Sequence, residues 1–521
     1  YGIANIDECL NLSLAYRLWQ GDALLVDMWD LQQFFGVVML PLAWLYMKVV
    51  GTTDGLILNL RYLFVMSMIG MAAFHYVRWR SYDERGAYWG SVAFALTCPF
   101  SLNNFTYNSV GVLLFSLVIT LYATNERQRL FDSVLCGIAY SASVLCCPFL
   151  VLAFPFFAFA CWYRKVIVRE GVPFVSGCCL VGAAVLALIF SRASLGDIIA
   201  SVPNFFGDNE HANRSLLIII RDWGGHFLLV QGAWSFVALA AAGVIFAYQR
   251  WFDKKCLAHD GMYRKVYFLI GFILLGEAIV LRPWPDFPVL PASVMALLAM
   301  GLVRDSRLLS VIWMGVVPAF IYGFCICAGS NQGSFVISSV LAASVVPACV
   351  VVSSVFGKVS RKLVVAFFVV QVMGVAYGHY KIVFWDASMP KLTTTIKKGP
   401  HRGLVTTPSN AAWNESVVDL TRQCLKDGDG VRVYFQLKSL WQAFMTDNRV
   451  GAYSLWVTDM KEEYPEHEFM ARMDKYYEMH PDKIPNLVGL DVESIRAIEH
   501  FKKKYGFREE ARNKYAVIMR R

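Results

Sequence analysis

Charged residues are what this sequence has least of. Asp, Glu, Lys and Arg make up only 17% of its 521 residues, and 57% of the residues are hydrophobic. Soluble domains average about 25% charged residues. The low charge and the mean hydropathy of +0.47 exclude an ordinary soluble protein and predict a polytopic membrane protein. The net charge of +9 does not indicate nucleic-acid binding, because Lys and Arg of membrane proteins collect in the loops of one side.

Common cofactor motifs are missing as well. The sequence has 13 cysteines but no C-x-x-C pair and no His/Cys spacing typical of zinc. Most of these cysteines lie in apolar runs, where they behave as small apolar residues. The polar C-terminal region has no G-x-G-x-x-G loop at a strand end, so we expect no nucleotide site there. We predict no certain cofactor, and leave a divalent cation bound by carboxylates open.

Apolar runs predict about twelve transmembrane helices. Most have close to the roughly 17–25 residues that span a bilayer. They are 57–77, 87–102, 108–123, 131–146, 148–163, 173–191, 224–247, 265–281, 287–303, 308–328, 335–356 and 362–379. The run at 34–50 contains Pro41 and follows a polar stretch, and whether it crosses the membrane decides the side of every later loop.

The distribution of Lys and Arg settles that assignment. If 34–50 lies in the outer interface, the connections between spans hold 18 Lys and Arg on one side and 4 on the other. Because cytoplasmic loops carry this excess, we predict that 1–56 and 380–521 are both extracytoplasmic. The chain starts at Tyr1 rather than Met, so we expect a further upstream helix, which would make thirteen spans. A cleaved signal peptide is the alternative.

The predicted organisation has three parts. Residues 1–56 form a first extracytoplasmic loop with interfacial helices, 57–379 a transmembrane helical domain, and 380–521 an extracytoplasmic domain. In the last part, strand patterns at 401–408, 430–437, 484–491 and 514–521 alternate with helix patterns at 414–425 and 492–506. We predict a small α/β domain on a multi-pass integral protein of the plasma or inner membrane.

Two adjacent acids stand at the start of the chain. Apolar residues recur at every fourth position from Ile6 to Leu18, which predicts a helix lying on the membrane surface. Asp7 and Glu8 fall in its first turn, where free N–H groups and the helix dipole favour an ionised carboxylate. Such a carboxylate can act as a general base or bind a metal. Simple capping and solubility is the alternative interpretation.

Further acids and arginines gather on the predicted outer side. Arg282 and Asp286 lie in a proline-stiffened turn, and Arg61 lies near the outer end of a span, where an ionisable group indicates function. Snorkelling of Arg61 to the interface is the alternative. The other candidates for a substrate site are Asp27, Trp29 and Asp30 in the first loop, and Glu210 and His211 in the longest outer loop. A solvated loop tip is the alternative for the last two.

The order of these motifs resembles the first outer loop of GT-C glycosyltransferases. A "DE" is followed by an amphipathic stretch ending in "GD", then by "VDMWDLQQ", a hydrophobic run with a proline, and an arginine opening the next span in "LRYLFV". The segment "KKGPHRGLVTTPSN", followed by strands and helices, is similar to the extracytoplasmic domain of many bacterial members. This superfamily includes protein O-mannosyltransferases and aminoarabinose transferases.

The resemblance implies transfer of a sugar from a polyprenyl-phosphate donor to a glycan, lipid or protein of the cell envelope. By motif position, the general base is Asp7, with Glu8 beside it. Arg61 and Arg282 would bind the donor phosphate, since Arg forks match phosphate oxygens. The chain departs from several family branches in its second outer loop, "PFSLNNFTYNS", which has no acid. Asp27, Asp30 or the 208–211 cluster would have to replace that acid.

Two other classes of protein fit the composition. A transporter or flippase would also have about twelve spans, but it should carry charged or Gly/Pro-broken helices near the midplane and paired halves. The sequence shows no such repeat. A non-catalytic membrane scaffold would tolerate loss of Asp7, whereas a transferase would not.

Overall fold

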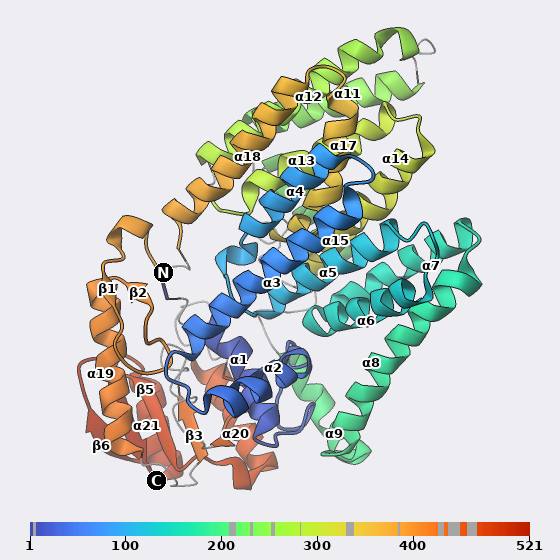
Figure 1. Ribbon diagram of the computed structural model, residues 1–521. Helices are drawn as coiled ribbons and strands as arrows, with labels where there is room; N and C mark the ends of the chain where they lie inside the picture. Colours follow the sequence, from blue (N-terminus) through green and yellow to red (C-terminus); the bar gives the residue numbers. More distant parts are fainter. Residues whose placement is uncertain are drawn as a thin grey trace.

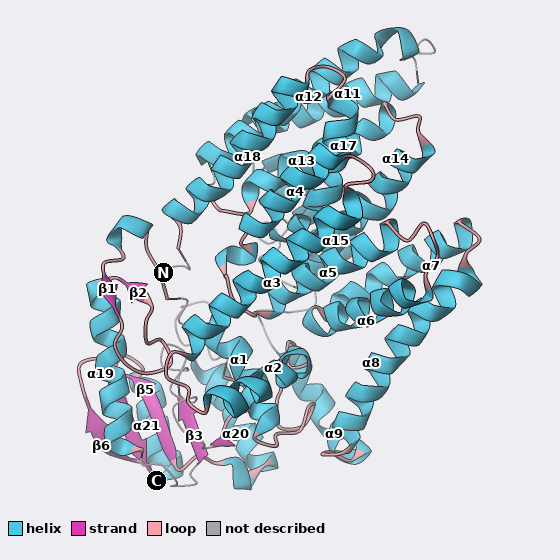
Figure 2. Ribbon diagram, in the orientation of Figure 1, coloured by secondary structure: helices cyan, strands magenta, loops and turns pink. Residues whose placement is uncertain are grey.

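The computed structural model describes residues 1–3, 7–207, 215–229, 233–251, 256–281, 283–329, 338–383, 386–425, 432–435, 449–455 and 466–521. It has two parts (Figure 1). A large bundle of helices carries the middle of the chain, and a smaller domain at one end of the bundle carries the C-terminus. The first helices of the chain lie between the two parts. Figure 2 shows that the strands are confined to the smaller part.

The described elements of the first 381 residues are helices joined by loops. Their bounds are α1 Asp7–Trp19, α2 Phe35–Val50, α3 Leu56–Trp79, α4 Glu84–Leu96, α5 Tyr107–Ala123, α6 Leu130–Cys146, α7 Phe154–Tyr163, α8 Val172–Phe190, α9 Leu195–Ser201, α10 Leu216–Leu229, α11 Ala233–Trp251, α12 Cys256–Leu281, α13 Leu290–Leu298, α14 Ser306–Val311, α15 Val317–Gly329, α17 Val345–Phe356 and α18 Arg361–Lys381. Short helices η1 Pro99–Ser101 and η6 Phe287–Val289 precede α5 and α13.

Five helical stretches of the described chain are long and apolar enough to cross a membrane. They are Leu56–Trp79, Ile167–Phe190, Ser306–Gly329, Ser338–Phe356 and Arg361–Lys381. Six shorter apolar helices of 10–17 residues accompany them, and all of these stretches coincide with predicted apolar runs. The chain is therefore an integral membrane protein, and the prediction of a polytopic helical domain is confirmed.

The helices differ in how much of their surface the protein covers. The apolar window of Ser338–Phe356 is 94% buried, whereas that of Ile167–Phe190 is only 28% buried. The outer helices expose large apolar side chains such as Trp162 and Leu180, which lipid accommodates and water does not. Inside the bundle, a methyl group added at Gly86 or Gly90 of α4 would overlap α17, so these glycines permit close helix packing.

The loops between the helices gather at two opposite ends of the bundle. At the end far from the α/β domain, Arg307 pairs with Glu126 at 2.9 Å and Arg169 donates to Gln128 at 3.2 Å. These contacts join three of the loops that are rich in Lys and Arg. At the other end, the Arg192 guanidinium donates to the Asp22 carbonyl at 3.0 Å. The loops thus sort as the charge distribution predicts, while the side of the membrane that each end faces stays a prediction.

The C-terminal part is the predicted α/β domain. Its strands are β3 Arg432–Phe435, β4 Arg449–Val450, β5 Leu487–Asp491, β6 Arg508–Arg512 and β7 Ala516–Arg520. They form one sheet in the order β4-β3-β5-β7-β6, in which β3 runs parallel to β4 and β5 while β7 is antiparallel to β5 and β6. Its helices are α19 Pro408–Cys424, α20 Glu466–Met479 and α21 Ile495–Tyr505.

Most of the predicted elements of this domain are present, and the structure adds β1, β4, β6 and α20, which were not predicted. The predicted strand at 401–408 is reduced to β2 Val405–Thr406, which pairs with β1 Thr394–Thr395 outside the main sheet. The edge strand β6 was not predicted, because its sequence Arg-Glu-Glu-Ala-Arg is polar. The central strand β5 is buried along its whole length, and this explains its clear apolar signal.

Candidate functional site

The first helix, α1, is enclosed by protein. It forms as predicted, and its apolar residues pack against α2, where a methyl group added at Gly36 would overlap Leu14 and Leu18. Every residue from Glu8 to Leu18 is buried, so protein covers the apolar stripe of this helix. Its position at the membrane surface stays a prediction. Asp7 is its first residue, and the side chain of Asp7 lies outside the described part of the structure.

Glu8 and Arg61 form a buried, two-pronged ion pair between α1 and α3. The Arg61 Nε donates to Glu8 Oε1 at 2.7 Å, and Nη2 donates to Oε2. The amide of Asn104 donates to the same Oε1 at 2.9 Å. Glu8 is completely buried and Arg61 is 5% exposed. Asn104 belongs to the second outer loop, so the acid-free loop contributes an amide that holds the acid of the first.

The remaining donor group of Arg61 is also occupied. Its Nη1 donates to the backbone carbonyls of Tyr1 and Gly2, each at 2.9 Å. All three guanidinium nitrogens therefore bond to the protein, and in this arrangement Arg61 orients Glu8 and the start of the chain. A phosphate contact by Arg61, as predicted from the sequence, would require Arg61 to break its hydrogen bonds to Glu8 or to these carbonyls.

A second buried carboxyl is linked to the 98–106 segment. Asp286 precedes η6 and is 2% exposed. It accepts a hydrogen bond from the Ser339 hydroxyl, which itself accepts from the Phe100 N–H at 3.2 Å. Burial raises the pKa of Asp286 to about 6, against the opposing effect of the Ser339 hydrogen bond. Among the described residues, Asp286 Oδ1 has no hydrogen-bond partner.

The backbone between these two groups is strained. Phe100 and Ser101 have φ angles of 60° and 58°, in the left-handed region that bulky residues avoid. Each such residue costs on the order of 1–3 kcal/mol, and strain of this kind clusters at functional sites. Hydrogen bonds link this turn to both carboxyls, through Asn104 to Glu8 and through Ser339 to Asp286. We call Glu8, Asp286 and the strained turn at Phe100 and Ser101 the turn-100 site.

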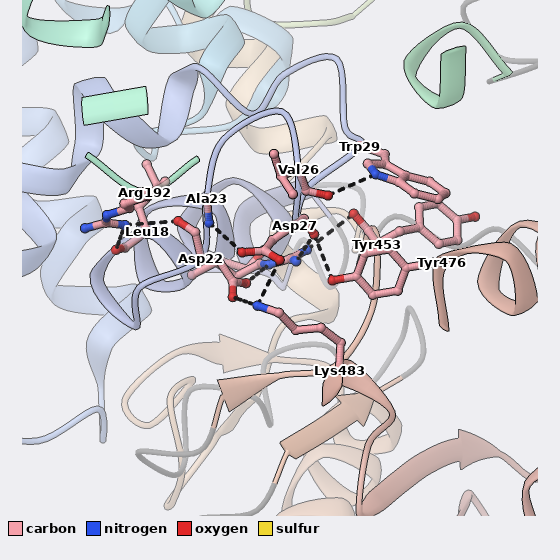
Figure 3. Close-up of polar contacts among 12 residues, drawn as sticks. Leu18, Asp22, Ala23, Val26, Asp27, Trp29, Arg192, Tyr453, Tyr476 and Lys483 are labelled. Atoms are coloured by element: carbon pink, nitrogen blue, oxygen red, sulfur yellow. Dashed lines mark hydrogen bonds and ion pairs between the residues drawn. The ribbon is translucent and has the colours of Figure 1, made fainter. Parts of the chain in front are cut away.

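A separate ionic cluster joins the first loop to the C-terminal domain (Figure 3). Lys483 bonds to Asp22 at 2.9 Å and to Asp27 at 3.0 Å. Arg17 of α1 donates to Asp22 at 2.7 Å. Burial alone would raise the pKa of Asp22, but Arg17 and Lys483 outweigh it and hold that pKa below its usual value. We call these four side chains the docking cluster.

Trp29 and Asp30 extend the same interface. The Trp29 ring lies 5.4 Å from the Tyr453 ring and 5.2 Å from the Tyr476 ring, between centroids, and is 2% exposed. Asp30 accepts a hydrogen bond from Ser454. Asp27, Trp29 and Asp30 therefore hold the α/β domain in place, and the structure does not bring them to the turn-100 site. Their predicted contact with substrate stays a prediction.

The other predicted site residues are outside the described chain. They are Arg282, Glu210 and His211. Arg282 stands four residues before Asp286 in the sequence. Among the described residues, no group of three or more His, Cys, Asp and Glu side chains is placed to hold a metal ion.

Sequence reasoning did not find several residues of these clusters. Lys483 sits in a polar turn among many exposed lysines, and Ser339 lies in an apolar run that predicts only a span. Asn104 was visible as an amide in an acid-free loop, but nothing local linked it to Glu8, 96 residues earlier. Only Asp286 carried a signal, because it is an acid in a proline-rich turn at the end of a span.

Comparison with known proteins adds one loose likeness. No family model and no curated protein matches the chain. A solved structure that is similar to it is the crystal structure of ArnT from Cupriavidus metallidurans bound to undecaprenyl phosphate. It is 13% identical, the overlap covers 88% of this chain and 83% of that chain, and the TM-score is 0.34. A TM-score this low does not define a shared fold, so the fold and the site rest on the residues described above.

The docking cluster predicts that replacing Lys483 destabilises the protein strongly. Lys483→Met leaves Asp22 and Asp27 with less positive charge in a buried place, and removing one partner of a buried ion pair costs about 3–5 kcal/mol. We expect a clear fall in Tm and faster proteolysis of the α/β domain in detergent. The matched control is Lys398→Met, whose partner Asp419 is 61% exposed and whose loss should cost about 1 kcal/mol or less. Equal effects of the two variants would contradict the docking role.

The raised pKa of Asp286 predicts that replacing this residue by Asn stabilises the protein in a pH-dependent way. Because the pKa of Asp286 is raised to about 6, the folded state binds the proton more tightly than the unfolded state. The buried carboxylate therefore lowers the free energy of unfolding progressively as the pH rises from about 4 to 6. Asp286→Asn should therefore stabilise the protein at pH 7.5 by up to about 3 kcal/mol and change little at pH 4. Thermal unfolding at the two pH values checks this.

The control for that experiment is Asp132→Asn. Asp132 pairs with Arg78 at 2.8 Å at the opposite end of the bundle, and its loss should destabilise the protein at pH 7.5. A fall in Tm for Asp286→Asn at both pH values would show that the carboxylate of Asp286 is not penalised by burial.

Proposed function

We propose that the protein is a membrane glycosyltransferase that moves a sugar from a polyprenyl-phosphate donor to a cell-envelope acceptor. The single observation that supports it is the turn-100 site. Two buried carboxyls, from Glu8 and Asp286, flank one strained turn at the end of the bundle that carries the α/β domain. In the proposed orientation this end is extracytoplasmic.

The chemistry needs few protein groups. The acceptor hydroxyl oxygen attacks the anomeric carbon and loses its proton to a carboxylate, while the bond from that carbon to the phosphate oxygen breaks. The electron pair leaves with the polyprenyl phosphate, which gains the negative charge. Because the donor carries its own leaving group, no nucleotide-binding fold is required. One displacement of this kind inverts the anomeric centre.

Asp7 is the proposed base, on the resemblance of the first loop to GT-C enzymes. Glu8, held by Arg61 and Asn104, positions the start of α1 and hence Asp7. Asp286 supplies the second carboxyl that the second outer loop lacks, because it bonds through Ser339 to Phe100 of that very segment. A carboxyl with a pKa near neutrality is suited to bind or exchange a proton during the reaction.

The remaining predicted residues take supporting roles in this proposal. Arg282, close in sequence to Asp286, binds the donor phosphate, since the Arg61 guanidinium is engaged by Glu8. Glu210 and His211 contact the acceptor from the longest outer loop. Asp27, Trp29 and Asp30 support the site by fixing the α/β domain over it.

The test is sugar transfer from radiolabelled polyprenyl-phosphate sugars in proteoliposomes. We expect turnover with the wild type and at least a 100-fold loss for Asp7→Asn, the usual size of a general-base contribution. The wild-type rate should fall below a pH of about 6, the pKa of Asp286, and Asp286→Asn, which resembles the protonated carboxyl, should show that lowered rate at every pH. Asp132→Asn, at the opposite end, should keep normal turnover per folded molecule.

Other results would change the assignment. Loss of turnover in Asp286→Asn with full activity in Asp7→Asn would move the base to Asp286. Movement of intact labelled lipid across the membrane, without transfer to any acceptor, would contradict the enzyme and support a flippase.

A further inference from the structure

A polar pocket lies at the end of the bundle opposite the turn-100 site. It has a volume of about 230 Å³, and its charged lining residues are Arg264, Arg304, Asp305 and Lys358. A water molecule occupies about 30 Å³ in the liquid, so the space holds a group of several heavy atoms. None of these residues takes part in the proposed transfer reaction.

Three different elements bring the cations together. Arg264 comes from the first half of α12, Arg304 from the connection before α14, and Lys358 from the turn after α17. Arg264 is 7% exposed, and its Nη1 donates to the Val355 carbonyl at 2.6 Å. Arg304 and Lys358 are exposed, which places Arg264 in the interior and the other two at the mouth.

Among the described lining residues, positive charge exceeds negative charge. Asp305 is the acid among them, and its Oδ1 already accepts from the Arg307 N–H at 2.8 Å as the cap of α14. Asp83 lies next to the lining and accepts from the Ser354 hydroxyl at 3.4 Å. Glu126, at the same end, is paired with Arg307. The described lining residues therefore carry a net charge of +2, with the buried Arg264 guanidinium at the back of the pocket. A bound anion would interact favourably with this net positive charge.

Helix capping explains only part of this cluster. The bond from Arg264 to Val355 satisfies a carbonyl in the last turn of α17, a common role for a basic residue. It gives no reason for Arg304 and Lys358 to converge on the same space. The pocket also has apolar lining from Leu302, Val303 and Leu308, so it suits a ligand with an anionic head and a less polar continuation.

We propose that this pocket binds a phosphate group, with Arg264 as the inner contact and Arg304 and Lys358 closing over it. Guanidinium groups match phosphate oxygens in geometry and charge. The pocket lies among the loops at the ends of the predicted spans, where we expect phospholipid headgroups. An anionic phospholipid and free phosphate share this chemistry. The inference is independent of the transfer reaction.

The experiment measures ligand binding through thermal stability of the full chain. The protein is reconstituted in nanodiscs of phosphatidylcholine alone and of phosphatidylcholine with increasing phosphatidylglycerol. A separate titration adds inorganic phosphate to the phosphatidylcholine sample. We expect a saturable rise in Tm with phosphatidylglycerol, and at least a tenfold weaker response in the Arg304→Ala/Lys358→Ala variant.

The matched control is Arg361→Ala/Lys362→Ala, two exposed basic residues at the same end that do not line the pocket. This variant should respond like the wild type. A rise in Tm with phosphate alone would identify free phosphate as the source of the ligand. An equal loss of response in both double variants, or none in either, would overturn the pocket and leave only general attraction to an anionic surface. All variants replace exposed side chains, and their Tm in phosphatidylcholine reports whether they fold.

Discussion

The buried ion pair between Glu8 and Arg61 is the contact on which this end of the molecule depends. Both charges are removed from water, so loss of either partner would leave an uncompensated charge at a cost of about 3–5 kcal/mol. The pair fixes α1 against α3, and the same guanidinium holds the carbonyls of the first two residues. Through Asn104 it also fixes the second outer segment. One arginine thus orders three parts of the chain that the sequence keeps far apart.

Backbone hydrogen bonds also hold the α/β domain at the same place, next to an ion pair of Arg422 with Asp54 at 3.2 Å. Backbone N–H groups of Gly55 and Ile57, at the start of α3, donate to the carbonyls of Gly399 and Pro400 at 3.1 Å. Next to them, burial and then Arg61 lower the pKa of His401 to about 3, so its ring is neutral at physiological pH. A neutral His401 avoids repulsion from Arg61. The start of α3 therefore supports both the N-terminal loop and the C-terminal domain.

Local composition explains which features were predictable from the sequence. Spans follow from hydropathy, and the sorting of loops follows from Lys and Arg counts, because membrane insertion depends on short stretches of sequence. The partners of Glu8 and Asp22 lie 53 and 461 residues away, and packing alone brings them together. The apolar stripe of α1 indicates a buried face, but the sequence does not say whether lipid or protein covers it, and in the structure protein does. Trp29, which the sequence offered as a candidate for the substrate site, is packed between Tyr453 and Tyr476, which lie far from it in the sequence.

The two ends of the bundle differ in the sign of the charge that they enclose. At the turn-100 site, a carboxyl without a cationic partner among the described residues is buried beside a strained turn, and both features cost stability. Such costs persist where the surroundings hold the arrangement in place, and here the Glu8–Arg61 pair and the docked domain do so. At the opposite end the excess charge is positive and lies in a pocket. A buried acid suits proton transfer to or from a substrate, whereas a basic pocket suits a permanent anion. The separation of these charges across the bundle therefore fits the proposed transfer reaction at one end and the proposed phosphate binding at the other.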